Sequence, residues 1–328
     1  MPLTDTSGPP SRPQLGVSAC LLGQPVRFDG GHQRNPFLAD QLAQFFDLVA
    51  FCPEMELGLG APRPSIQLRQ QDGRVQLVSG RAAGQGQAED LTGPMLKLAG
   101  QWAERLGAVD GLVVKRGSPS CGLERVPVVV GPNLPRRHDG QGVFTQELRR
   151  LLPLVPVEEE GRLQDPLLRE VFLERVFALH RWRQIPDPEH SVGGLVEFHA
   201  RHKLLLMARG PQLYAELGRI VAGVTRASLA QRRAAYIARF MEVMALRPSR
   251  RKHINVLQHI MGYLKRDLSR DDKRELLDLF DAYRHERLSL VSPLVLLRHH
   301  LRRIPNVWLE SQYYLAPFPA ALAPRARI

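Results

Sequence analysis

The chain has 328 residues, of which 44% are hydrophobic and 24% charged, and its net charge is +12 at pH 7. This composition is typical of a globular protein, and the length is sufficient for two domains, which excludes fibrous and fully disordered chains. No run of 18 or more apolar residues occurs, so the sequence predicts no transmembrane helix and no membrane partner.

The N-terminal segment, residues 1–13, is polar and rich in proline. It lacks the apolar core of a signal peptide, and it predicts a disordered tail. Without an export signal we expect a cytoplasmic protein, whose three cysteines stay reduced. An odd number of cysteines favours a metal or catalytic site over a disulfide framework.

Positive charge is concentrated in the second half of the chain. Residues 1–183 contain 21 Lys and Arg against 20 Asp and Glu, whereas residues 184–328 contain 24 against 13. A basic region beside a near-neutral one indicates that one part carries out chemistry while the other binds a polyanion such as a nucleic acid. The alternative is a solvated basic surface that aids solubility.

Strands and helices alternate through the first half. Apolar runs predict strands at 15–22, 48–51, 112–114 and 126–130, a hairpin over 66–78 and an edge strand at 154–157. Amphipathic runs predict helices at 36–47, 88–106 and 144–152. This alternation is typical of an α/β domain with a Rossmann-like, mostly parallel sheet.

The second half predicts helices alone. A long helix over 165–185 ends at Pro186 and Pro188, which mark a domain boundary. Further helices are expected at 194–208, 211–222, 228–246, 253–267, 270–286 and 293–303. We therefore expect an α/β domain over 14–160, a helical linker over 161–190, an all-α domain over 191–310 and a C-terminal tail over 311–328.

Each of the three cysteines lies at or just after the end of a predicted strand. They are Cys20, Cys52 and Cys121. The carboxyl ends of strands in an open α/β sheet converge on one crevice, where ligands bind. The alternative is that the cysteines are small buried hydrophobic side chains. Against it, Glu54 follows Cys52 closely, and Ser118 and Ser120 precede Cys121.

Three thiolates are compatible with two kinds of metal site. A structural zinc usually requires a fourth Cys or His. A 4Fe-4S cluster held by three cysteines has one iron without a protein ligand, and this thiophilic Lewis acid can bind a substrate sulfur. A nearby carboxylate can then activate water, and a hydroxyl can donate a hydrogen bond to the leaving group.

The segments that carry these residues resemble a known family. Residues 17–23, 26–32, 52–63 and 115–122 are similar to the thiouracil desulfidases of the TudS type, and the resemblance extends from residue 15 to about 160. It implies a 4Fe-4S cluster on the three cysteines, whose open iron binds the thiocarbonyl sulfur of a thiolated uracil before water replaces that sulfur. It places the catalytic carboxylate at Glu54 and the catalytic serine at Ser118, with Ser120 as the alternative.

The helical half resembles the domain that is fused to this desulfidase in RudS-type proteins. The similar segments are residues 195–204 and 214–218. The resemblance implies removal of sulfur from 4-thiouridine in tRNA, with the helical domain helping to hold the tRNA. We therefore expect thiolated tRNA as a partner and predict no protein partner.

Pairs of basic residues at helix ends suit phosphate binding, although most single arginines are simply solvated. The candidate RNA-binding residues are Arg232, Arg233, Arg247, Arg250, Arg251, Lys252, Lys265 and Arg266. We favour residues 247–252, in a turn between two predicted helices. His199 and His202 lie three residues apart, but no third metal ligand is evident, so packing within the bundle is the preferred interpretation.

Three hypotheses follow. The first is a cluster-dependent tRNA 4-thiouridine desulfidase, and the second is a desulfidase of free thiouracil or thiouridine nucleosides. The third is a cluster-based redox sensor that binds nucleic acid. Glu54 and Ser118 argue against the third, because a sensor needs neither.

Overall fold

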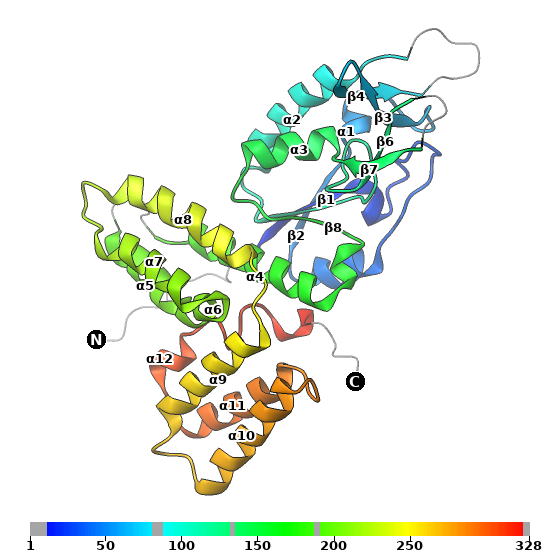
Figure 1. Cartoon of the computed structure of the whole chain (residues 1–328). Helices are drawn as coiled ribbons and strands as arrows, with labels where there is room; N and C mark the ends of the chain where they lie inside the picture. Colours follow the sequence, from blue (N-terminus) through cyan, green and yellow to red (C-terminus); the bar gives the residue numbers. More distant parts are fainter. Residues whose placement is uncertain (1–11, 81–87, 132–134, 187–190, 324–328) are drawn as a thin grey trace. The chain divides into compact units, whose positions relative to one another are not determined.

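The structure is a computed structural model that describes residues 12–80, 88–131, 135–186 and 191–323 (Figure 1). Most of the predicted N-terminal tail, residues 1–11, lies outside the described residues. The chain divides into two compact units, Met1–Phe172 and Leu173–Ile328. The division falls within α4 (Pro166–Arg183), inside the segment predicted as a helical linker.

A parallel sheet forms the centre of the first unit. Its strands occur in the order β2 (Asp47–Phe51), β1 (Gln14–Ser18), β5 (Gly111–Val114) and β8 (Val157–Glu159), and all neighbours are parallel. All four residues of β5 are buried, as expected for a strand covered on both faces. The predicted α/β fold is confirmed. Because β1 lies between β2 and β5, the crevice expected at a topological switch point opens at the carboxyl ends of these strands.

Two helices, α2 (Thr92–Leu106) and α3 (Val143–Leu151), lie side by side in this unit (Figure 1). The ring of Phe51, at the end of β2, lies 6.0 Å from that of Trp102 on α2 and 5.8 Å from that of Phe144 on α3. This aromatic contact fixes the end of β2, and with it the position of the following Cys52.

A second four-stranded sheet was not expected. It has the order β4 (Arg74–Ser79), β3 (Ile66–Gln71), β6 (Val126–Val129) and β7 (Arg137–Gly140). The predicted hairpin is β3–β4, but the strand predicted at 126–130 pairs with this hairpin instead of extending the parallel sheet. Strand β7 was not predicted from the sequence. Arg137, His138 and Asp139 are all exposed, so the segment lacks the alternation of apolar and polar residues that indicates a strand.

Three predicted elements differ from those observed. The first strand ends at Ser18, and residues Ala19–Leu22 form a 3-10 turn that stops at Gly23, where φ is +94°. The helix predicted at 36–47 is a π-helical turn, Phe37–Gln41, followed by a 3-10 turn, Leu42–Gln44. The edge strand begins at Val157 and not at Leu154.

The regular secondary structure of the second unit, within its described residues, consists of helices without strands (Figure 1). After α4 come α5 (Val192–Arg201), α6 (Lys203–Arg209), α7 (Pro211–Ala222), α8 (Leu229–Ala245), α9 (Arg250–Leu264), α10 (Arg270–Arg284), α11 (Val291–Arg303) and α12 (Val307–Glu310). The single helix predicted over 194–208 is two helices that meet at His202. Helix α9 starts three residues earlier than predicted, because the hydroxyl of Ser249 accepts a hydrogen bond from the Lys252 amide and caps it.

The described part of the predicted C-terminal tail, residues 311–323, packs onto the helical unit. Tyr314, Leu315, Phe318 and Leu322 are all buried, and the Tyr314 hydroxyl lies 2.8 Å from Nδ1 of His253 on α9. The proline and alanine content of this segment predicted a tail without structure, although these four buried side chains attach it to the helices. No helix in the described ranges is both long and apolar enough to cross a membrane.

Candidate active site

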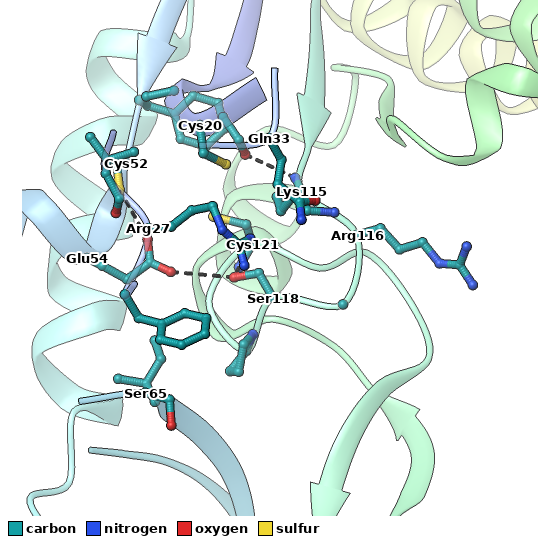
Figure 2. A pocket seen from close by; sticks show the side chains of 18 of the residues that line it. Cys20, Arg27, Gln33, Cys52, Glu54, Ser65, Lys115, Arg116, Ser118 and Cys121 are labelled. Carbon is teal, nitrogen blue, oxygen red and sulfur yellow. Dashed lines mark hydrogen bonds between the residues drawn. The ribbon is translucent and has the colours of Figure 1, made fainter. Parts of the chain in front are cut away.

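A cavity of about 370 Å³ opens at the carboxyl ends of β1, β2 and β5. Cys20, Cys52, Cys121, Glu54 and Ser118 all line it. Figure 2 shows the thiols of these cysteines and the Glu54 carboxylate around one space, whereas the Arg116 side chain extends away from it. Residues that are far apart in the sequence thus meet where the strand ends were predicted to converge.

Local backbone geometry places the first two cysteines and the carboxylate. Cys20 lies in the 3-10 turn after β1, and its carbonyl accepts a hydrogen bond from the Gln33 amide at 2.9 Å. Cys52 directly precedes α1 (Pro53–Glu56), whose first residue is proline, a residue pre-organised for the first turn of a helix. Glu54 is the next residue, so the helical turn projects its carboxylate beside the Cys52 thiol.

The third cysteine is held by the loop over 115–122 and by the start of α3. The first amides of a helix have no partner within the helix. Here the amides of Val143, Phe144 and Thr145 donate to the carbonyls of Pro119 and Ser120. The Thr145 hydroxyl donates to the Cys121 carbonyl at 2.7 Å. The loop thereby caps α3, and α3 fixes the loop.

Two glycines allow this close approach of loop and helix. A Cβ at Gly142 would lie 2.5 Å from the Ser120 carbonyl oxygen and 2.6 Å from the Gly122 nitrogen. A Cβ at Gly122 would lie 2.8 Å from the Ser118 carbonyl oxygen. Any side chain at either position would therefore displace the segment that carries Ser118, Ser120 and Cys121.

Glu54 is the centre of a hydrogen-bond network. Its Oε1 accepts from the Ser120 hydroxyl and, at 3.4 Å, from the Ser118 hydroxyl, and its Oε2 accepts from the Cys52 thiol at 3.3 Å. The two serine hydroxyls lie 2.9 Å apart. Ser120 is fully buried, whereas Ser118 lines the cavity. Of the two candidate serines, Ser118 therefore borders the cavity, whereas Ser120 contacts the carboxylate from its buried side.

Burial and Glu54 together disfavour thiolates at this site. Burial, with the nearby Glu54 charge, raises the pKa of Cys20 to about 11 and that of Cys52 to about 12. The pKa of Cys121 is also raised, chiefly by burial, then by Glu54 and by charge on the other two cysteines. The three sulfurs are thus close enough to interact, and forming all three thiolates requires added positive charge.

Cationic side chains supply part of that charge at the cavity wall. Lys115 and Arg27 oppose the rise in the Cys20 pKa, and Arg63 opposes that of Cys52. Lys115 forms an ion pair with Glu160, and Arg63 donates to the Val26 carbonyl at 2.9 Å. Sequence reasoning did not assign these residues to the site, although all three lie in or beside the segments that resemble desulfidases.

The donor set fits a polynuclear cluster better than a single ion. No three His, Cys, Asp or Glu side chains in the described ranges are grouped tightly enough to hold one metal ion. Three mutually interacting thiols around one cavity, with an excess of negative charge once ionised, instead match the thiolate ligands of a larger cationic iron–sulfur group.

The candidate RNA-binding residues differ in their exposure to solvent and in their contacts within the protein. Arg233 is only 9% exposed and lies over the Trp182 ring, so it is not available to a phosphate. Arg232 donates to the Ile220 carbonyl, and Arg250 pairs with Glu286. The remaining candidates are partly or fully exposed: Arg247, Arg251, Lys252, Lys265 and Arg266.

His199 and His202 are packed within the bundle. The His199 ring stacks on Tyr214 with centroids 4.9 Å apart, and its Nδ1 lies 3.1 Å from the Tyr236 hydroxyl. His202 Nδ1 lies 2.7 Å from the Phe198 carbonyl oxygen. Burial lowers the pKa of both imidazoles.

Comparison with known proteins matches the two halves of the chain to two different family models. Residues 15–160 match the model of the 2-thiouracil desulfurase family. The first half of the chain therefore carries a domain of the 2-thiouracil desulfurase type. Residues 203–319 match a second family model, described as a protein of unknown function. The protein therefore joins a desulfurase domain to a helical domain.

Two individual proteins are also similar. The chain is 29% identical over 151 residues to the uncharacterised protein YbgA of Escherichia coli, a match that covers 46% of this chain and 89% of that protein. It is 31% identical to the [4Fe-4S]-dependent thiouracil desulfidase TudS, a solved structure, with 47% of this chain and 95% of that one covered and a TM-score of 0.38.

Proposed function

We propose that this protein removes sulfur from 4-thiouridine in tRNA and leaves uridine. The observation that carries the proposal is the meeting of three cysteines, a carboxylate and a serine in one cavity. Net reaction with water converts the C=S group to C=O and releases the sulfur at the level of sulfide, so no oxidant or reductant is needed.

We assign Cys20, Cys52 and Cys121 as ligands of a 4Fe-4S cluster. The similarity to a desulfidase described as [4Fe-4S]-dependent and the thiol-rich cavity support this cofactor. When bound, the cluster would supply an iron without a protein ligand, which is thiophilic and acts as a Lewis acid toward the thiocarbonyl sulfur. Its positive charge would also offset the cost of forming three buried thiolates.

Glu54 and Ser118 are the proposed catalytic residues. Glu54, held by Ser120, takes a proton from the water that attacks the ring carbon. Ser118, on the cavity side of the same network, donates a hydrogen bond to the pyrimidine as negative charge develops there. Burial of the site limits competing water and strengthens both interactions.

The charge of the second half supports tRNA as the substrate. The excess of basic residues falls in residues 184–328, and exposed arginines and lysines are available at the start and end of α9. A folded RNA is held mainly through its phosphates and a few stacked bases.

The decisive experiment uses protein purified without oxygen. It is incubated with tRNA that contains 4-thiouridine, and the digested nucleosides are quantified. We expect loss of 4-thiouridine with a matching gain of uridine, and no conversion by Cys20→Ala, Cys52→Ala or Cys121→Ala. Full conversion by any of these variants would contradict the ligand assignment.

A second candidate is desulfidation of free thiouracil, because the family model and the similar solved structure are both named for that base. Release of sulfur from the free base with none from tRNA would favour it. Binding of nucleic acid that depends on cluster oxidation, with no sulfur release from any substrate, would favour the redox sensor.

A further inference from the structure

A second cavity lies in the helical unit and carries strong positive charge. Its volume is about 590 Å³, and it lies between the first turns of α7 and α9. Its lining contains three cations and three side-chain amides but no carboxylate: Arg251, Lys252, Arg284, Gln212, Asn255 and Gln258. This chemistry suits a phosphate together with the polar edge of a base.

The three cations have no acidic partner among the described residues. Arg251, Lys252 and Arg284 form no ion pair there, and the Lys252 ammonium donates to the Arg209 carbonyl, which leaves its charge uncompensated. Neighbouring arginines differ, because Arg250 pairs with Glu286 and Arg239 pairs with Glu216. Positive charge that is not neutralised inside a concavity attracts an anion more strongly than charge on an open helix face.

An aromatic cluster lies further along the same helix. The rings of Tyr263 on α9 and Trp308 on α12 stack with centroids 4.7 Å apart, and Tyr263 remains 43% exposed. The Lys203 ammonium lies 5.3 Å from the Trp308 centroid and 5.8 Å from that of Tyr214. A half-exposed aromatic stack beside a lysine is typical of surfaces on which nucleobases stack.

The cavity and the aromatic cluster share one face of α9. Arg251, Asn255, His259 and Tyr263 follow one another at intervals of four residues, which places them in a single row, here called the α9 row. Twelve residues of helix extend about 18 Å. One RNA segment can therefore contact both ends of the row.

We infer that the α9 row is the RNA-binding surface of the helical unit. An RNA segment places its phosphates in the cavity of Arg251, Lys252 and Arg284, and one unpaired base stacks on Tyr263. The inference builds on the proposed tRNA substrate and names the surface that holds it. An acidic peptide would satisfy the cavity but would leave the aromatic end without a partner.

Binding to an unmodified tRNA transcript tests this directly, because no sulfur chemistry is involved. The full chain carries either Arg251→Glu with Arg284→Glu, or the matched control Arg226→Glu with Arg274→Glu, which makes the same change in net charge at exposed positions outside the cavity. Losing two phosphate contacts should weaken binding and reduce the slope of log affinity against log salt by about 1.4–1.8. Equal affinities for the two double variants would overturn the inference.

The aromatic end has its own variants. Tyr263→Ala should weaken binding by about tenfold, the loss expected for one base stack, whereas Tyr263→Phe should retain the affinity. Circular dichroism melting identifies any variant that fails to fold. Equal binding by Tyr263→Ala and wild type, or displacement of the tRNA by polyglutamate at equal charge concentration, would overturn the base-stacking assignment.

Failure of this inference and failure of the proposed function give different results. If the α9 row binds tRNA but wild-type protein releases no sulfur from it, the RNA surface is correct and the substrate assignment is wrong. If wild type desulfurates tRNA and the Arg251→Glu, Arg284→Glu variant does so with unchanged KM, the substrate is correct and the surface is wrong.

Discussion

Glu54 interacts with all three cysteines and with both serines, through hydrogen bonds or through its charge. Its two oxygens accept hydrogen bonds from a thiol and two hydroxyls, and burial of the three cysteines raises their pKa values with a further rise from the Glu54 charge. A buried carboxylate with such partners has a fixed orientation, which is what a general base requires.

Replacement of Glu54 by Gln keeps the size of the side chain and most of its hydrogen bonds but removes the base. We expect Glu54→Gln to lower kcat for desulfidation by about 100-fold or more, the usual contribution of a general base. Single-turnover assays under anaerobic conditions measure this, with iron content as the control for cluster loading. Wild-type turnover in an iron-loaded variant would show that another group activates the water.

Alanine substitutions of Ser118 and Ser120 should differ in their effects on stability and on turnover. Ser120→Ala removes the buried one of the two hydroxyl donors to Glu54 Oε1 and should lower the free energy of unfolding by about 1–3 kcal/mol, as well as reducing turnover. Ser118→Ala, at the cavity surface, should reduce turnover with little change in stability. Urea unfolding and desulfidation assays on both variants test the distinction, and the reverse pattern would exchange the two roles.

At the scale of elements, the contact between the 115–122 loop and the start of α3 determines the geometry of the site. The helix amides need acceptors and the loop carbonyls need donors, so each element satisfies the other. Glycine at position 142 permits the required separation. The precision of the site thus depends on backbone contacts beneath it.

We expect Gly142→Ala to disrupt this contact. The added Cβ would fall within 2.6 Å of loop backbone atoms, so the loop must move and carry Cys121 with it. Iron content and turnover should both fall. Gly100→Ala is the matched control, because nothing lies within 4 Å of a Cβ there and alanine is the better helix former. Full iron loading and turnover in Gly142→Ala would mean that the loop tolerates displacement.

Much of this organisation could be predicted from the sequence. The alternation of strands and helices predicted the parallel sheet. The positions of the cysteines after predicted strands indicated that they would meet in one crevice, as they do. The second sheet could not be predicted, because β7 is polar and pairing partners are set by tertiary contacts. The burial of Arg233 could not be predicted either, because the sequence does not show which arginine of the pair Arg232 and Arg233 is turned into the core.

At the scale of the whole molecule, buried histidines link stability to pH. Burial lowers the pKa of His253 to about 3, with Arg209 and Arg250 adding to the effect, and that of His199 to about 4. Both imidazoles titrate near 6.5 in the unfolded chain. Below that pH the unfolded state binds protons that the native state does not. The contribution of the two buried histidines to the free energy of unfolding is therefore fully present above about pH 7 and falls on acidification.

Thermal melts between pH 7.5 and 5 should therefore show a falling Tm, and the fall should be smaller in His253→Gln. That variant loses a proton-binding group from the unfolded state, although it is expected to be less stable at pH 7.5 because of its lost contact with Tyr314. The control is His138→Gln, at an exposed position. An unchanged pH dependence in His253→Gln would show that other groups control acid unfolding.

The glycine beneath the site has a consequence for genetics. Every replacement of Gly142 adds at least a Cβ, so all replacements share the same clash with the loop. In a saturation-mutagenesis map of sulfur release, this position should be as intolerant as the cysteines, although it contributes no atom to the cavity. A ranking of positions by their intolerance of substitution would wrongly class Gly142 as a catalytic residue. The backbone contacts at Gly142 show that it supports the site and takes no part in the reaction.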